Sequence, residues 1–168
     1  MNILRKSLDT DSSSPIANWG HLILRASIGA MIFYIHGWHK LEGGLAYLQQ
    51  GTPWPLLKEV AEMHFPAPVA SAFAATALQF LCSPLLALGL FTRLNAALLT
   101  GTLSVAILQN LLAGRDPQLA ILYVLVLLSL VFLGGGRFSL DALLSRRVHF
   151  ASQSTDGLGS SLRRSSTR

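Results

Sequence analysis

Four apolar segments, separated by short polar stretches, follow one another along the chain. Three contain no charged residue, and the first is interrupted by a few charged or histidine positions; they cover residues 16–41, 69–91, 94–113 and 119–133. A helix of about 20 apolar residues crosses the ~30 Å hydrocarbon core of a bilayer. The pattern therefore predicts an all-α fold, an integral membrane four-helix bundle over residues 16–144.

The predicted connections differ in length. The stretches "GLFTRLN" and "AGRDPQ" indicate tight turns, the first on the inner side and the second on the outer side, where Pro117 suits the start of a helix. Residues 42–68 form one longer outer loop. Within it, Leu56, Leu57 and Val60 fall on one side of a short helix starting after Pro55, which predicts an interfacial helix with Trp54 at the headgroups. A plain solvated loop is the alternative.

Polar segments flank the predicted bundle. Residues 1–15 carry Arg5 and Lys6 followed by "DTDSSSP", with no small-residue cleavage site, so we expect no cleaved signal peptide. Residues 145–168 are rich in Ser, Gly and Arg, which predicts a disordered basic tail.

Charge indicates the orientation. The chain is 51% hydrophobic, only 12% charged, and carries a formal net charge of +5. Basic residues on the side of both termini outnumber Lys40, Lys58 and Arg115 on the other side, which favours cytoplasmic N- and C-termini. Membrane lipid headgroups are then the nearest partners, and nucleic acid is excluded because no recognition motif is present.

Several kinds of chemistry lack the residues that they require. Cys82 is the single cysteine, so a disulfide within the chain and a dithiol motif are excluded. The last three apolar segments contain no histidine, which disfavours haem ligation between facing helices, and no ligand set for a metal is visible. The sequence identifies no catalytic residue. Small residues at four-residue steps, such as Ala97 and Gly101, indicate close helix packing.

Polar residues of the first segment share one predicted face. At 100° and 1.5 Å per residue, this face holds Arg25, Gly29, Ile32, His36 and Lys40. Arg25 and His36 are ~16 Å apart along the axis, so there are two polar levels.

The outer level predicts a ligand pocket. His36 and Lys40 reach the same height as Asn110 and Tyr123, with His39 at the rim. Neutral His36 would bond an oxygen of a lipophilic ligand such as quinone, while Lys40 would favour an anionic form. A proton relay through His36 also fits. Alternatively, His36 and Lys40 only mark the outer end of the helix.

The inner level centres on Arg25, for which no apolar segment supplies an Asp or Glu. Its expected partners are hydroxyls, carbonyls freed near Pro84, Gln79, water, or an oxygen of a lipid or ligand. The alternative is that Arg25 snorkels to the inner headgroups.

Four motifs, "LILRASIGAMIFYIHGWHKL", "FPAP", "LLALGLFTRLNAALL" and "GGGRFSLDALL", occur in order over residues 22–144. Together they resemble the DoxX family of small four-helix membrane proteins. The resemblance implies a multi-pass protein of the bacterial cytoplasmic membrane. Some members look like subunits of terminal quinol oxidase or thiosulfate:quinone oxidoreductase systems, and others are associated with thiol and oxidative-stress defence.

The resemblance also marks individual positions. These are Arg25, Gly29, His36, Gly37, Lys40, Gly89, Arg93, Gly136, Arg137 and Asp141. Many relatives have a glutamate where this chain has Gln79, a departure that removes a counter-ion for Arg25. In the last motif, Arg137 is expected to anchor the fourth helix, and Ser139 or Asp141 to cap a short following helix.

The function expected from these observations is that of a redox accessory subunit. It would bind quinone or a similar lipophilic molecule through His36, Lys40, Arg25, Gln79, Asn110 and Tyr123, and would work with an electron-carrying protein partner, without a redox cofactor of its own. A membrane scaffold or assembly protein is the first alternative, and a small transporter the second. Assembly into a homo-oligomer stays open.

Overall fold

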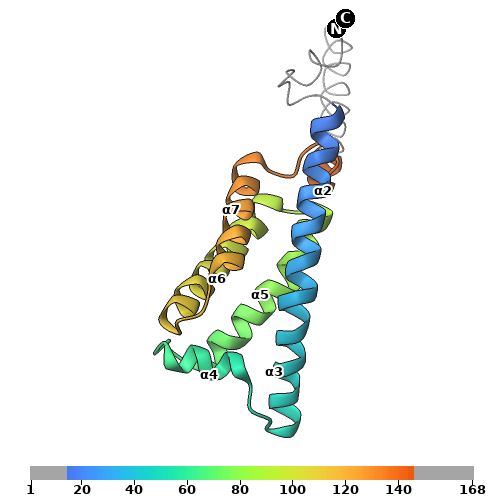
Figure 1. Cartoon of the computed structure of the whole chain (residues 1–168). Helices are drawn as coiled ribbons and strands as arrows, with labels where there is room; N and C mark the ends of the chain where they lie inside the picture. The colour runs from blue at the N-terminus through green and yellow to red at the C-terminus, as the bar shows by residue number, and fades with distance from the viewer. Residues whose placement is uncertain (1–14, 146–168) are drawn as a thin grey trace, which may run out of the picture.

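The computed structural model describes residues 15–145, and the regular elements in that range are helices. A long rod comes first, made of α2 (Pro15–Met31), η1 (Ile32–Trp38) and α3 (His39–Gln50) without a break (Figure 1). The rod ends at Gly51, whose φ is 67°. The predicted end at residue 41 is therefore wrong. Gly43 and Gly44, which look like a loop signal, instead let the helix pack against Trp54.

A π-helix interrupts the rod at η1. Its wider i to i+5 turn shifts the faces of the helix relative to an ideal α-helix. Buried positions run through Arg25, Gly29 and Ile32, and the next one is Gly37, five residues later. The prediction of one straight polar stripe is therefore wrong beyond Ile32, and His36 is only partly buried.

The short helix α4 (Pro55–Glu62) lies across one end of the molecule (Figure 1). Its buried Leu56 and Val60 belong to a cluster with Trp54 and Ala72. The helix is thus confirmed, and the alternative of a solvated loop is wrong. The side chain of Trp54 is only 4% exposed, and its ring centroid lies 4.8 Å from that of Phe73, so Trp54 packs inside the protein.

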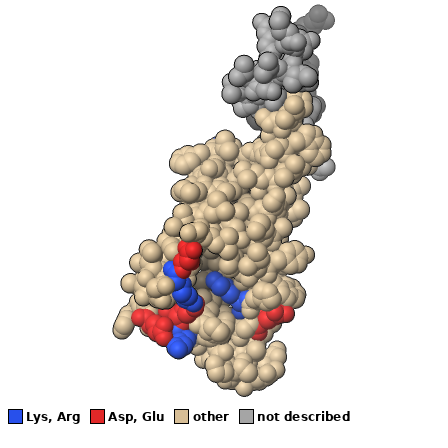
Figure 2. Space-filling view, in the orientation of Figure 1, with Lys and Arg blue, Asp and Glu red and all other residues tan. Residues whose placement is uncertain are grey.

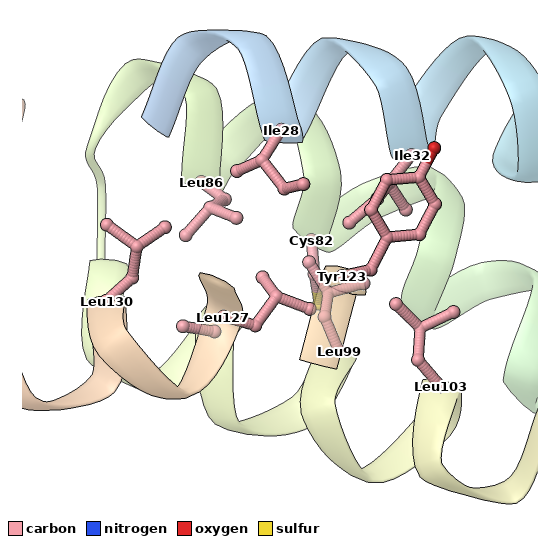
Figure 3. Close-up of a cluster of buried hydrophobic side chains, with 10 residues drawn as sticks. Ile28, Ile32, Cys82, Leu86, Leu99, Leu103, Tyr123, Leu127 and Leu130 are labelled. Carbon is pink, nitrogen blue, oxygen red and sulfur yellow. The ribbon is translucent and has the colours of Figure 1, made fainter. Parts of the chain in front are cut away.

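The remaining helices form an antiparallel series: α5 (Pro68–Leu88), α6 (Thr92–Leu112) and α7 (Gln118–Leu133). These bounds agree with the predicted segments. Ile28 and Ile32 of the rod meet Leu86, Leu99, Leu127 and other apolar residues of α5 to α7 in one core (Figure 3). Hydrophobicity places these segments in the bilayer, and close side-chain contacts hold them around this core.

The chain is an all-helical membrane protein. Within the described residues, three helices are long and apolar enough to cross a bilayer: the rod Pro15–Gln50, α5 and α6. The helix α7 is apolar but shorter. On the face in Figure 2, charged side chains gather near α4, and the other described residues on this face are uncharged. The predicted N-terminal segment and disordered tail lie outside the described residues, apart from Pro15 and Ser145.

Candidate functional site

A groove of about 450 Å³ lies between α5 and α6 and is closed at one end by α4 and the chain that follows it. This volume falls in the range of small-molecule sites, roughly 300–1,000 Å³. The lining is mainly apolar and consists of Lys40, Leu56, Val60, Met63, Phe65, Ser71, Ala74, Ala75, Leu78, Ala97, Leu98, Gly101, Thr102, Val105, Ala106 and Gln109.

Small residues make the groove. Ala74 and Ala75 on α5 face Ala97 and Gly101 on α6 across it. A Cβ atom added to Gly101 would have no neighbour within 4 Å. The expectation of close packing at Gly101 is therefore wrong, since its missing side chain leaves space.

The polar side chains of the groove are concentrated in a few residues. Lys40 is the charged residue among those that line it. The Nε2 atom of Gln109 is buried without a hydrogen-bond partner in the described part of the chain. The hydroxyls of Ser71 and Thr102 already donate to the carbonyls of Pro66 and Leu98, at 2.8 and 3.0 Å. Lys40 and Gln109 therefore have hydrogen-bonding capacity left for a ligand.

Lys40 is not neutralised by a contact with Glu59 of α4. The Oε1 atom of Glu59 is instead 2.9 Å from Nη1 of Arg115 in the α6–α7 turn. Over residues 15–145, Lys40 takes part in no ion pair within 4.0 Å, so its ammonium group can bind an anion or a carbonyl oxygen.

The predicted outer pocket is divided in the structure. His36 and Tyr123 meet, with ring centroids 5.7 Å apart and planes at 83°, but neither lines the groove. Tyr123 points from α7 toward the rod, and its buried hydroxyl has no partner in the described region (Figure 3). Asn110 is partly buried outside the lining, and exposed His39 pairs with Glu42 at 3.5 Å.

Arg25 occupies a separate site at the other end of α5. Its side chain donates hydrogen bonds to the carbonyls of Ala87 (3.3 Å), Phe138 (3.0 Å) and Gly135. The exposed fraction is 1%, so the snorkelling alternative is wrong. Carbonyls at a helix C-terminus lack intrahelical donors and carry partial negative charge, which suits a guanidinium. Arg25 therefore contacts carbonyls, but these lie at the end of α5 and after α7 and are not the one that Pro84 leaves without a donor.

Gln79 does not join the Arg25 site through a hydrogen bond. Its side chain is fully buried on α5, and neither its amide oxygen nor its amide nitrogen has a partner within residues 15–145. The ligand-binding roles expected for Gln79, Arg25, His36, Asn110 and Tyr123 stay predictions.

The glycines singled out in the sequence motifs have structural roles. A Cβ atom on Gly29 would lie 2.7 Å from the Ser83 carbonyl oxygen, and one on Gly37 would lie 3.2 Å from that of Gln79. Both glycines therefore let the rod approach α5. Gly136 has a φ of 73°, in the left-handed region that favours glycine.

Ser139 and Asp141 cap different helices. The Ser139 hydroxyl accepts a hydrogen bond from the Ala142 N–H at 3.1 Å, at the start of a helical turn over residues 140–145. Asp141 instead accepts from the backbone N–H groups of Phe91 and Thr92 at 2.7 and 2.9 Å. Capping by Ser139 is thus confirmed. The contact of Asp141 with the start of α6 could not be predicted, because the two segments are far apart in the sequence.

The two arginines near this turn differ in their contacts. Arg93 donates to the Phe132 carbonyl at 3.4 Å, and Arg137 is exposed. In residues 15–145, no three His, Cys, Asp or Glu side chains come together as metal ligands.

Comparison with known proteins identifies the family. The family model described as DoxX matches residues 20–112, which is more than half of the chain. This confirms the resemblance based on the first three motifs, while "GGGRFSLDALL" follows the matched range. No curated protein and no solved structure matches the chain.

Proposed function

The chain belongs to the DoxX family, and on this premise we propose that it is an accessory subunit of a membrane redox system. The proposed system is linked to quinone or to thiol and oxidative-stress defence. The ligand is quinone or a similar lipophilic molecule, held between α5 and α6. Electrons are exchanged with a separate protein partner.

One observation carries this proposal: Lys40 is the charged residue lining an otherwise mainly apolar groove. The apolar walls suit a ring and hydrocarbon, and the ammonium group suits a carbonyl oxygen, or the negative charge that develops when a quinone is reduced. A hydrogen bond to a charged group contributes roughly 1.5–3 kcal/mol. Lys40 therefore supplies most of the polar affinity in this proposal.

We further propose that the protein lies in the bacterial cytoplasmic membrane with both termini in the cytoplasm. Support comes from the concentration of basic residues toward the termini and from the contact of Trp19 with Phe138, whose ring centroids are 5.1 Å apart. That contact places the beginning of α2 near the segment that follows α7.

Binding of a short-chain quinone analogue to protein in lipid nanodiscs tests the proposal. We expect saturable binding that Lys40→Met weakens by about ten- to hundredfold, the equivalent of one charged hydrogen bond. The matched control is Lys58→Met, since Lys58 is an exposed residue of α4 outside the groove. Equal binding by all three proteins would contradict the proposed ligand site.

A further inference from the structure

We propose that the groove is filled sideways from the bilayer, so that its ligand is a single-chain amphiphile with its head at Lys40 and its chain along Gly101. This inference rests on the proposed function, because it concerns the same site. It adds the class of ligand and the direction from which that ligand enters.

The open side of the groove faces the position of the hydrocarbon. Leu98 and Val105 line the groove and are 38% and 39% exposed on the side of α6. Ala97 and Gly101 are exposed as well. All of these residues lie within the candidate span Thr92–Leu112. In a membrane, the open side therefore meets lipid chains, and no polar barrier lies between them and the groove.

The shape of the groove suits a chain. Ala97, Gly101 and Val105 are successive i+4 neighbours on one face of α6 and extend over about 12 Å of the helix axis. Gly101 leaves an open space at the centre of this row. A narrow wall of small side chains can accommodate one flexible chain beside the helix.

The head must lie at the α4 end. Lys40 and Gln109 supply the available polar atoms, and α4 with its following residues, including Val60 and Met63, closes this end. The unpartnered Nε2 atom of Gln109 is a donor, as is the Lys40 ammonium. Two donors favour a head with acceptor oxygens.

The surrounding lipid determines how much the head and the chain of the ligand each contribute to binding. Lipid tails are as apolar as the groove, so a chain gains little free energy by moving from the bilayer into it. The groove therefore orients the chain, while the head at Lys40 provides selectivity.

Two photoreactive quinone analogues test this arrangement in nanodiscs. One carries a diazirine at the far end of a single alkyl chain, and the other carries it on the ring. After irradiation, peptide mass spectrometry locates the label. We expect the chain-end probe to label residues 97–105 and the ring probe to label Lys40 or α4. Excess unlabelled analogue should abolish both.

Gly101→Leu fills the groove, and Gly20→Leu is the matched control, because a Cβ at either glycine meets no atom within 4 Å. Leucine also has a higher helix propensity than glycine, so both variants should fold. We expect Gly101→Leu to lose chain-end labelling at residues 97–105, while saturable binding through Lys40 changes by less than about tenfold, because the chain gains little free energy in the groove. Gly20→Leu should behave like the wild type.

The outcomes separate the two proposals. Saturable, Lys40-dependent binding in which the chain-end probe labels other residues, or still labels residues 97–105 in Gly101→Leu, overturns lateral loading and leaves the proposed function in place. Absence of saturable labelling by both probes overturns both.

Discussion

The carboxylate of Asp141 caps the first turn of α6 by accepting a 2.9 Å hydrogen bond from the N–H of Thr92, 49 residues earlier in the chain. The same carboxylate accepts from the Thr92 hydroxyl at 3.0 Å. The Asp141 N–H donates to the Gly89 carbonyl at 3.0 Å. These bonds fasten the segment after α7 to the turn between α5 and α6.

Replacing Asp141 with alanine should lower the free energy of unfolding by about 2 kcal/mol, because two backbone N–H groups at a helix start lose a charged acceptor. Thermal unfolding in detergent, followed by the reaction of buried Cys82 with a thiol-reactive dye, measures the change. Glu62→Ala removes only an exposed partner of Lys58 and should change stability by less than about 1 kcal/mol. Equal stability of the two variants would contradict the capping role.

Gly89→Ala should destabilise the protein far more than Gly51→Ala. Both glycines have positive φ, 75° and 67°, so both substitutions carry a backbone cost of about 1–2 kcal/mol. A Cβ at Gly89 would also clash with Nη1 of Arg25, whereas one at Gly51 meets no atom within 4 Å. The same unfolding assay compares the two variants. Similar losses of stability would show that the Arg25 side chain moves aside at little cost.

Arg25→Met should lower the free energy of unfolding by about 3 kcal/mol or more. The variant leaves the carbonyls of Ala87, Gly135 and Phe138 without their donor. Arg137→Met, at an exposed position, is the control and should have a small effect. Quinone-analogue binding by folded Arg25→Met should remain, since Arg25 does not line the groove. Loss of binding with full stability would instead make Arg25 a ligand contact.

Gln79→Met should preserve or raise stability, by up to about 1 kcal/mol. The substitution replaces a buried amide, which has no hydrogen-bond partner among the described residues, with an apolar side chain of similar shape. The control is Thr76→Val, which removes a buried hydroxyl that donates to the Ala72 carbonyl at 2.9 Å and should lower stability. Clear destabilisation by Gln79→Met would reveal a bound polar molecule at the amide.

His36→Leu should leave binding of the quinone analogue unchanged within about twofold, in contrast to Lys40→Met. His36 contacts the ring of Tyr123 and does not line the groove, whereas Lys40 does. Binding measured in nanodiscs for both variants checks this difference. A loss with His36→Leu as large as that with Lys40→Met would support the sequence-based pocket instead.

Hydrophobic patterning was sufficient to predict the helices but not their local geometry. The length of each apolar segment and the proline or glycine at its ends set the bounds of α5, α6 and α7. Gly43 and Gly44 could not be assigned to packing in advance, because their neighbour Trp54 belongs to another segment. The π-helix also has no simple sequence signal, so a uniform turn of 100° per residue failed after Ile32.

The candidate site was predicted only in part for the same reason. Depth along a helix follows from the residue number, and it correctly brought His36 to the level of Tyr123. The direction of a side chain around the helix axis depends on packing, so Lys40 could not be separated from His36. Small residues on two adjacent helices, with a lysine at one end, are the signal that could have indicated the groove.

The order of synthesis gives the Asp141 cap a further consequence. The ribosome adds Thr92 before Asp141, so α6 emerges while the N–H groups of its first turn still lack this acceptor. That acceptor becomes available only once α7 has been translated. Asp141 therefore forms its hydrogen bonds only after α7 has been made. A nascent chain halted before Asp141 would leave the α5–α6 turn without them.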